Sequence, residues 1–528
     1  MAVEFTNEKT LRVINPANLK VLGEVKLTDP LTIPAIVKEA SLSVHLWNER
    51  GLNYRLNKIK RFKKLLLENQ KEIAGLLSQE SGKPVMESLA GEIFGVLETC
   101  DWLKKNTAKL LQPQKVSLNQ LMFFGKRSYN IFEPIGVIAI ISPWNFPFSI
   151  SVNSMLMALA CGNTVVLKPS PKTPLIGQAI KKLFDQAGFP SGVVNVVQGD
   201  KDVASHLVLA DVARVVFTGG VEGGKAIMSL AAQKLHPVTL ELGGKHPAIV
   251  LADADVEKIA QTIVWSSFTN AGQACAAIER LYVERPIADK LSKRIAELTS
   301  QLQLGDSLDA ETDIGPLIDA DQLRRVKAQV EQAVSCGAKI IAGGKERPDL
   351  GGYFFEPTVL VDVTDQMDVI RQEIFGPILP IMVVEDESEA VRRANNSNLA
   401  LGASIWTSNT KHGEELARRI QSGMVWINDA LYSHIAPDAP WGGMKDSGFG
   451  RSHSALSLRE LVNVKHIGVD KQGKRNWNFP YSGNSLVLIR TALQACHAES
   501  VISRVSAFIR LPFALLNARK DKFFRRPK

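Results

Sequence analysis

The sequence predicts an α/β protein built around a parallel sheet that helices cover on both faces. The first observation is a series of continuous apolar runs of strand length, beginning with "IGVIAII" at 135–141. The second is that segments of helical period, such as "TPLIGQAIKKLFDQAG" at 173–188, lie between these runs. Apolar strands that alternate with amphipathic helices are typical of such sheets. With 528 residues, the chain is long enough for two or three domains.

Composition narrows the class of protein. Apolar residues make up 45% and charged residues 22%, which is ordinary for a soluble globular protein. The five cysteines are scattered and no CxxC or HExxH pair occurs, so neither a disulfide scaffold nor a metal site is expected. A reducing, cytoplasmic compartment is favoured, and "MAVEFTNEKTLRVINP" lacks the pattern of a signal peptide. No uninterrupted run of 18 apolar residues occurs, so no conventional transmembrane helix is expected.

The formal net charge of +9 is concentrated at the carboxyl end of the chain. Residues 501–528 hold eight Lys and Arg residues against one Asp, which gives this segment a charge of +7. The rest of the chain is therefore close to neutral. Nucleic acid is not an expected partner, because a nucleic-acid-binding body usually carries a basic surface.

The elements follow one another in a clear order. Residues 54–111 have helical periodicity, with a Gly-Lys-Pro stop at 82–84, and alternation around "FFGKR" predicts a hairpin within 115–134. The predicted strands that follow lie at 135–141, 163–169, 192–197, 212–220 and 237–244. Each is followed by a polar or glycine-rich segment, which suits the carboxyl edge of a parallel sheet, where ligands bind. A second strand-and-helix series runs from 246 to about 445, so two α/β domains are expected.

One glycine-rich turn is a weak indication of phosphate binding. The stretch "FTGGVEGGK" contains Gly219, Gly220, Gly223 and Gly224, a spacing that does not fit G-x-G-x-x-G. Glycine-rich turns after strands are common, so this segment alone leaves the ligand open.

The combination of motifs is more specific than any one of them. The motifs occur in the order "SPWNFP" (142–147), "LKPS" (167–170), "FTGG" (217–220), "LELGGK" (240–245), "GQAC" (272–275), "EIFGP" (373–377) and "PWGGMKDSGFGR" (440–451). In these motifs the chain resembles the aldehyde dehydrogenase superfamily, from about residue 14 to about residue 466. The resemblance implies the aldehyde dehydrogenase fold, with a variant Rossmann cofactor domain, an α/β catalytic domain and a β-hairpin oligomerisation arm.

The implied domains are discontinuous in the sequence. They are an NAD(P)-binding domain at 1–114 and 135–242, a catalytic domain at 243–445, an oligomerisation arm at 115–134 and 446–480, and a basic amphipathic extension at 481–528. By the same resemblance, the protein is expected to form a homodimer or a homotetramer.

The resemblance also implies a mechanism. Cys275 would attack the aldehyde carbonyl and form a thiohemiacetal, whose oxyanion would be bound by the Asn145 side chain and the Cys275 backbone N–H. Hydride transfer to NAD or NADP would leave a thioester, which water activated by Glu241 would hydrolyse. Glu241 precedes Cys275 by 34 residues, the usual interval in the family.

The implied cofactor site comprises Lys168, Ser170, Gly199, Gly219, Gly220, Gly224, Trp144, Leu242, Glu373 and Phe375. Two departures from the family pattern bear on it. Where a ribose-binding Glu is common, this chain has Pro171 followed by Lys172, so NADP is not repelled and the choice between NAD and NADP stays open. Gly220 replaces a hydroxyl residue that can contact the pyrophosphate.

Other interpretations of these residues remain. Free cysteines are usually small buried hydrophobic residues, which is how Cys100, Cys161, Cys336 and Cys496 are interpreted. Asn145 could be a turn residue between prolines, and Glu241 could be an ion-pair partner at a strand end. The alternative functions are a CoA-acylating aldehyde dehydrogenase and a catalytically silent lipid-binding or scaffold protein. The presence of Glu241 argues against the first, and the intact set of three residues argues against the second.

The carboxyl-terminal third bears on the substrate. The segment "NDALYSHIAPDAPWGGMKDSGFGR", followed by "WNFPYS", looks like members that act on long lipophilic aldehydes, including diapolycopene-type dialdehydes. The tail "SVISRVSAFIRLPFALLNARKDKFFRRPK" has apolar residues at helical spacing, interrupted at Pro512, among many cations. This pattern predicts a basic amphipathic helix that attaches peripherally to an anionic inner membrane surface. The other interpretation is a helix packed on the body of the protein.

Overall fold

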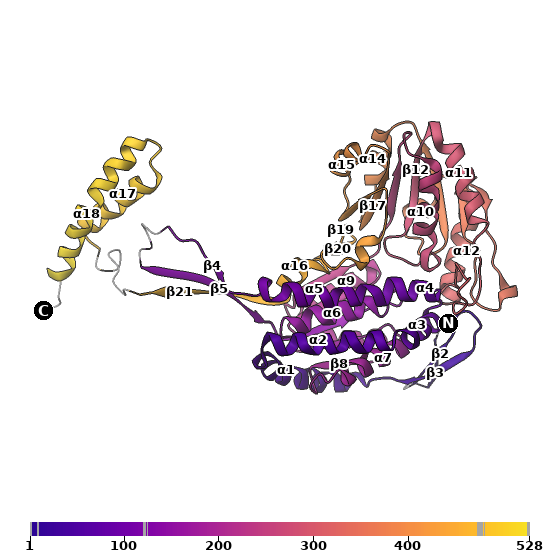
Figure 1. Ribbon diagram of the computed structural model, residues 1–528, viewed down its shortest axis with the longest axis horizontal. Coiled ribbons are helices and arrows are strands. Elements are labelled where there is room, and N and C mark those ends of the chain that lie inside the picture. Colours follow the sequence, from indigo (N-terminus) through magenta and orange to yellow (C-terminus); the bar gives the residue numbers. More distant parts are fainter. Residues whose placement is uncertain are drawn as a thin grey trace. The chain divides into compact units, whose positions relative to one another are not determined.

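The computed structural model describes residues 3–7, 10–119, 123, 125–471, 479 and 481–524. Contacts within the chain divide it into two compact units. The first consists of Met1–Leu110 and Pro134–Asn463, and the second of Leu111–Glu133 and Val464–Lys528. The ribbon in Figure 1 follows the elements of both units in sequence order.

The first unit begins with a small antiparallel sheet of order β1-β2-β3, followed by helices. The strands of this sheet are β1 (Val3–Asn7), β2 (Thr10–Ile14) and β3 (Val21–Lys26). The helical elements after it are α1 (Ile33–Glu49), α2 (Gly51–Glu68), α3 (Gln70–Ser81), α4 (Val85–Glu87), the π-helical turn η2 (Ser88–Phe94) and α5 (Gly95–Leu110). Helix α3 ends at Gly82, whose φ of 81° is left-handed, so the predicted stop is confirmed.

A parallel sheet with one antiparallel edge strand forms the first α/β layer of the described chain, in the order β20-β10-β9-β6-β7-β8. Its strands are β6 (Val137–Ile141), β7 (Thr164–Lys168), β8 (Val194–Val196), β9 (Arg214–Thr218), β10 (Val238–Glu241) and β20 (Gly448–Phe449). The strands β6 and β7 are buried along their whole length, as expected for strands covered on both faces.

Helices cover both faces of this sheet. On one face, α1 packs with α8 (Lys201–Leu209) and the strands in one apolar cluster. Helix α6 (Ser149–Ala160) contacts β6 and β7 and is itself covered by α2 and α5. The remaining helices of this layer are α7 (Pro174–Gln186) and α9 (Val221–Ala232). The predicted alternation of strand and helix is therefore confirmed.

A second sheet has the order β13-β14-β15-β12-β11-β17-β18 in the described residues. Its strands are β11 (His246–Val250), β12 (Ile278–Glu284), β13 (Lys339–Ala342), β14 (Thr358–Val361), β15 (Ile378–Val384), β17 (Gly402–Trp406) and β18 (Met424–Ile427). Its helices are α10 (Val256–Phe268), α11 (Arg285–Thr299), α12 (Ala320–Ser335), α13 (Asp368–Arg371), α14 (Glu387–Asn395) and α15 (Thr410–Ala417). The pair β16 (Leu399–Ala400) and β19 (Met444–Lys445) and helix α16 (Ser454–Glu460) complete the unit.

The second unit contains a sheet of order β21-β5-β4. The strands β4 (Gln114–Lys115) and β5 (Lys126–Pro134) pair antiparallel, which confirms the strands of the predicted hairpin. Its centre, 120–122 and 124, lies outside the described residues. Strand β21 (Val462–Asp470) lies beside β5.

The same unit contains a helical hairpin formed by α17 (Gly483–His497) and α18 (Val501–Phe524). The predicted interruption at Pro512 was wrong, because α18 continues through it. Proline removes one backbone hydrogen bond, but Leu511 and Ala514 on either side pack in the apolar cluster between the two helices. That packing offsets the lost bond.

One helix bears on the expectation that no conventional transmembrane helix occurs. The segment Val501–Lys520 is long and apolar enough to cross a membrane, by length and composition alone, and 17% of its apolar window is buried within the protein. The segment still contains no uninterrupted apolar run of 18 residues, because polar residues, Arg504 and Arg510 among them, lie within it. The mean hydropathy of the segment is 1.3 even though both charges are included.

Candidate active site

The candidate site lies at the carboxyl ends of the strands of the first sheet. Glu241 is the last residue of β10, and Lys168 is the last residue of β7. Asn145 follows β6 by four residues, and Gly219 directly follows β9. Because these strands are parallel, their carboxyl ends meet at one edge of the sheet. The expectation that the polar and glycine-rich segments lie at this edge is confirmed.

The loop that carries Cys275 has an unusual backbone. It follows helix α10 through a short turn, Thr269–Gly272. Asn270 and Ala271 both have a φ of 52°, and Gly272 has a φ of 70°. A Cβ on Gly272 would lie 2.1 Å from the backbone oxygen of Gly376, so only glycine fits there. Left-handed non-glycine residues cost free energy and persist only where the surrounding structure holds them.

Asn145 is buried beside this loop. Its side-chain nitrogen Nδ2 donates to the backbone oxygen of Gln273 at 3.1 Å, which ties it to the loop two residues before Cys275. An amide nitrogen carries two N–H groups, so one remains to point elsewhere.

Glu241 is also buried, and its two oxygens differ. Oε1 accepts a hydrogen bond from the backbone N–H of Ser452 at 3.0 Å. Oε2 is buried without a partner among the described residues. Burial raises the pKa of Glu241 to about 8, with the Ser452 hydrogen bond and the charge of Arg451 acting in the opposite direction. The carboxyl group therefore titrates within the physiological range.

Cys275 lies where two cavities meet. One cavity, of about 200 Å³, is lined by Trp144, Asn145, Gly219, Glu241, Cys275, Glu373 and Phe375, among others. The other, of about 40 Å³, is lined by Cys275 and Glu241 and by a mixture of apolar and polar residues, the apolar ones including Ile150, Met157, Leu401 and Trp441. A ligand in either cavity can therefore reach the sulfur. Cys275 therefore differs from Cys100 and Cys161, which are buried.

The thiol is neutral in this arrangement. Desolvation raises the pKa of Cys275 to about 12, and the carboxylates of Glu373 and Glu241 add to the effect. Burial, together with the charge of Glu279, raises the pKa of Glu373 to about 7. A positive charge bound beside the thiol would lower its pKa again.

Comparison with known proteins agrees with this geometry. The family model "Aldehyde dehydrogenase family" matches residues 3–467. This chain belongs to the aldehyde dehydrogenase family. It is an oxidoreductase that acts on aldehydes and uses NAD or NADP.

Relatives of this aldehyde dehydrogenase cover most of its length. It is 36% identical over 497 residues to a Methylomonas protein named 4,4'-diapolycopene aldehyde oxidase. The aligned residues cover 93% of this chain and 92% of the relative. It is 35% identical over 458 residues to a Mycobacterium ulcerans (strain Agy99) protein named putative succinate-semialdehyde dehydrogenase [NADP(+)] 2. The aligned residues cover 85% of this chain and 88% of the relative.

Solved structures support the fold as well. An NAD+ complex of a Bacillus cereus aldehyde dehydrogenase has a TM-score of 0.84 and 36% identity, covering 88% of this chain and 94% of that one. An E. coli NADP-dependent enzyme has a TM-score of 0.84 and 32% identity, covering 88% and 95%. The predicted fold class is thereby confirmed.

The predicted cofactor residues of this aldehyde dehydrogenase fall into two groups. Those that line the larger cavity are Trp144, Gly219, Gly220, Leu242, Glu373 and Phe375. Those outside its lining are Lys168, Ser170, Gly199 and Gly224. The ring of Phe375 meets that of Trp144 edge-on at 5.3 Å. A Cβ on Gly224 would lie 2.6 Å from Leu242, which shows how closely α9 approaches the end of β10.

Lys168 supports the fit of a dinucleotide. Its ammonium is buried, and the one hydrogen bond described for it goes to the adjacent backbone oxygen of Pro169, at 3.2 Å. Burial lowers its pKa to about 8. Such a group gains from acceptors such as ribose hydroxyls. Lys172, in contrast, is already paired with Asp319 at 2.6 Å, which weakens its attraction for a 2′-phosphate.

Sequence reasoning missed two histidines in the cavity lined by Trp441. His434 and His453 both face the space that contains Cys275 and Glu241, with ring centroids 6.5 Å apart. Burial lowers the pKa of His434 to about 3 and that of His453 to about 4, so both rings are neutral at pH 7. Each lies in a segment without periodicity, so no spacing indicated that the two would meet.

The remaining cysteines differ from one another. Cys100 and Cys161 are buried as predicted, and Cys496 is partly exposed. The interpretation of Cys336 as buried was wrong, because it caps the carboxyl end of α12 at the surface. Among the described residues, no group of three His, Cys, Asp or Glu side chains is placed to hold a metal ion.

Proposed function

We propose that this aldehyde dehydrogenase oxidises its substrate through a covalent intermediate on Cys275. The observation that carries the proposal is the position of Cys275 between the two cavities. One cavity offers space for a nicotinamide ring beside Glu373 and Phe375, and the other offers space for an aldehyde. Hydride transfer requires the aldehyde carbon, once bonded to the sulfur, to lie against the nicotinamide ring.

In the first step the Cys275 thiol gives up its proton to solvent, and the sulfur, as thiolate, adds to the aldehyde carbon. The carbonyl oxygen becomes an oxyanion, for which the free N–H of the Asn145 side chain and the Cys275 backbone N–H are the proposed donors. NAD(P), when bound, accepts the hydride that leaves this carbon. The product at Cys275 is then a thioester.

In the second step water adds to the thioester carbon, the C–S bond breaks, and the carboxylic acid leaves as the thiol re-forms. Glu241 is the proposed general base, and its unpartnered Oε2 is the oxygen available to take the proton of that water. Hydrogen bonding of Oε1 to Ser452 holds the carboxylate in one orientation.

The proposed cofactor contacts follow from the family resemblance, and some of these residues line the larger cavity. Lys168 and Ser170 would bind the adenosine ribose, and Gly199, Gly219, Gly220 and Gly224 would allow the adenine and pyrophosphate to approach the backbone. Glu373 would hold the nicotinamide ribose, with Trp144, Leu242 and Phe375 packing near the ring. The choice between NAD and NADP is left open, because Pro171 removes a repelling carboxylate and Lys172 is paired with Asp319.

The substrate we propose is a long, neutral, lipophilic aldehyde. No Lys or Arg is among the residues that line the substrate-side cavity, and its two histidines are neutral at pH 7. A carboxylate-bearing semialdehyde would need a cation there, because an unpaired buried carboxylate is costly. The similarity to a protein named diapolycopene aldehyde oxidase supports the same choice.

Steady-state kinetics with aldehydes of increasing length tests this substrate class. We expect kcat/KM to rise by about 4-fold for each buried CH₂ group, at about 0.8 kcal/mol each, until the cavity is full. Succinate semialdehyde should be at least about 100-fold poorer than an apolar aldehyde of equal length. Each substrate should be measured with NAD and with NADP, and the product assayed as free acid and as acyl-CoA. A flat dependence on chain length would contradict the lipophilic assignment, and acyl-CoA as the product would contradict hydrolysis.

We further propose that the α17–α18 hairpin attaches the enzyme to an anionic membrane surface. Small residues make up much of the seam between the two helices, together with Leu488 and the partly buried Leu511 and Leu515; the small residues are Ala492, Ala495, Ala507, Ala514 and Ala518. Large apolar side chains point outward instead: Ile502 is 82% exposed, Phe513 is 67% and Ile509 is 65%. A small-residue seam with large apolar residues outside is typical of helices in lipid. The cations on α18 complement the negative charge of anionic headgroups; they are Arg504, Arg510, Arg519 and Lys520.

Cosedimentation with vesicles tests the membrane proposal. The wild type should bind vesicles that contain anionic lipid, bind neutral vesicles weakly, and lose binding as salt screens the cations. The double variant Ile509→Asp, Phe513→Asp should bind at least about tenfold more weakly, because two charges would enter the apolar layer. Leu235→Asp is the matched control, since Leu235 is 89% exposed and lies in the other unit. Equal binding by the double variant would exclude the hairpin.

The remaining assignments are proposals of the same kind. The domain boundaries are those of the sequence analysis: 1–114 with 135–242, 243–445, 115–134 with 446–480, and 481–528. A homodimer or homotetramer, and a cytoplasmic location at the inner membrane surface, complete the proposed description.

A further inference from the structure

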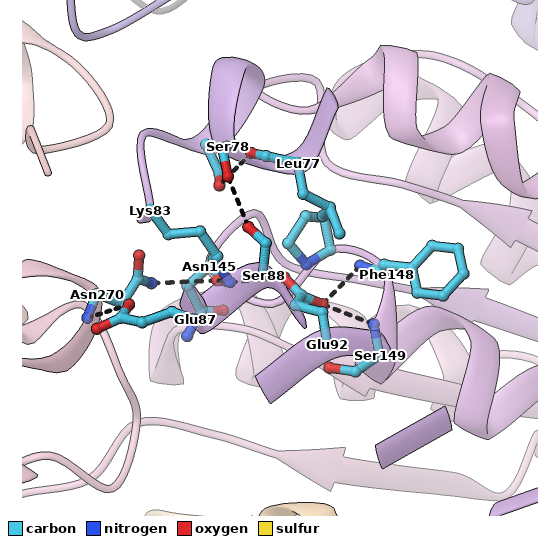
Figure 2. Close-up of polar contacts among 12 residues, drawn as sticks. Leu77, Ser78, Lys83, Glu87, Ser88, Glu92, Asn145, Phe148, Ser149 and Asn270 are labelled. Atoms are coloured by element: carbon cyan, nitrogen blue, oxygen red, sulfur yellow. Dashed lines mark hydrogen bonds and ion pairs between the residues drawn. The ribbon is translucent and has the colours of Figure 1, made fainter. Parts of the chain in front are cut away.

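A buried lysine lies behind Asn145. The side chain of Lys83 is fully buried, and its ammonium donates to Glu92 Oε1 at 2.6 Å and to the backbone oxygen of Asn145 at 2.7 Å (Figure 2). The same ammonium lies over the ring of Phe146, 4.0 Å from its centroid. A buried charge is costly unless its partners are well placed. The sequence marks Lys83 only as part of a helix stop, so its position next to Asn145 is new information.

Glu92 connects this lysine to helix α6. Its second oxygen, Oε2, accepts hydrogen bonds from the backbone N–H groups of Phe148 and Ser149, at 3.1 and 2.7 Å (Figure 2). A carboxylate is favoured at a helix amino terminus by the unpaired N–H groups there. Glu92 lies on the π-helical turn η2, and such turns are frequent at functional sites. The chain from Asn145 to Ser149 is thereby held at both ends.

Glu87 connects the same region to the nucleophile loop. Its oxygens accept from the Thr269 hydroxyl at 2.9 Å and from the Asn270 N–H at 2.8 Å. The Asn270 side chain in turn donates to the backbone oxygen of Asn145 at 3.2 Å. The Asn145 carbonyl therefore receives two donors, Lys83 and Asn270. Asn270 is one of the left-handed residues of the loop, so these contacts stabilise a strained backbone.

We propose that Lys83, Glu87 and Glu92 form a positioning network that fixes the Asn145 side chain relative to Cys275. None of the three lines either cavity, so they act through Asn145 and the loop and are not catalytic residues. The inference rests on the proposed role of Asn145 in binding the oxyanion. An oxyanion donor is effective only when it is held in place before the reaction, and a misplacement of about 1 Å can cost about 100-fold in rate.

A double-mutant cycle between Lys83→Met and Asn145→Ala tests this network. Lys83→Met alone should lower kcat by about 100-fold with little change in the KM for NAD(P), because the positioning is lost and the cofactor cavity is intact. In the Asn145→Ala background, the same substitution should lower kcat by less than about threefold. Equal losses in both backgrounds would overturn the proposal, because they would show a general structural role.

Two further variants keep the test decisive. Glu87→Gln retains the shape and one acceptor, so it should fold even where Lys83→Met does not, and it should show the same non-additivity with Asn145→Ala. Glu80→Gln is the matched control: Glu80 is a buried carboxylate that accepts from the Leu175 and Ile176 N–H groups at the start of α7, and no contact is described between it and Asn145. Its effect on kcat should be small and additive with Asn145→Ala. If Asn145→Ala alone left kcat unchanged, the proposed function would fail, whereas additivity alone would remove only the network.

Discussion

Cys275→Ala is expected to abolish aldehyde-dependent reduction of NAD(P), with kcat falling by about 10⁴-fold or more. Alanine removes the sulfur that forms the covalent bond, and no other thiol is among the described residues that line the two cavities. Losses of this size are usual when the nucleophile of a covalent mechanism is removed. The measurement is the initial rate at which the absorbance of NAD(P)H increases with a saturating lipophilic aldehyde.

Three further measurements make the result specific. The dissociation constant of NAD(P) should stay within about threefold of the wild-type value, because the cofactor contacts proposed here do not include the sulfur. Cys336→Ala is the control, because Cys336 is exposed at the end of α12 and should leave activity unchanged. Mass spectrometry of the wild type quenched during turnover should find the acyl group on the peptide that contains Cys275. Wild-type activity in Cys275→Ala would refute the covalent mechanism.

The three proposed catalytic residues lie where the sequence motifs indicated a site. Glu241 ends a strand of the first sheet and Asn145 follows another, so the pattern of apolar runs with polar ends was enough to bring them to one edge. Their roles came from the family resemblance, because spacing alone cannot distinguish a general base from an ion-pair partner. The backbone of the loop at Asn270 and Ala271 could not have been predicted, since neither residue type requires a left-handed conformation.

Helical periodicity in the sequence could not predict the network around Lys83. Lys83 and Glu92 are nine residues apart and meet across a π-helical turn, which shifts the phase of the helix by about one residue. An α-helical pattern would assign them to unrelated faces. In the tail, Pro512 alone would predict a break in the helix, but α18 continues through it because it packs on α17. In both regions, packing between segments decided the structure, and neither helical periodicity nor the helix-breaking effect of proline could predict it.

Glu241→Gln is expected to separate the two halves of the reaction. Glutamine keeps the shape of the side chain and can still accept from the Ser452 N–H, but it cannot take a proton from water. The first turnover should still produce NAD(P)H, about one equivalent per site, while the steady-state kcat falls by about 10²–10⁴-fold. A rapid-mixing experiment should therefore show a burst followed by a nearly flat trace. A slow first turnover would show that Glu241 acts before the thioester forms.

The pH dependence gives an independent reading of the same carboxyl group. Burial raises the pKa of Glu241 to about 8, so only about one-tenth of the enzyme carries the basic form at pH 7 and about nine-tenths at pH 9. Where hydrolysis limits turnover, kcat should rise about tenfold between these values and fall as the pH decreases through 8. The Cys275 thiol, with a pKa of about 12 in the free enzyme, adds no titration in this range. Glu241→Gln should lose the rise in kcat, and a rise that survives in this variant would assign the titration to another group, such as Glu373.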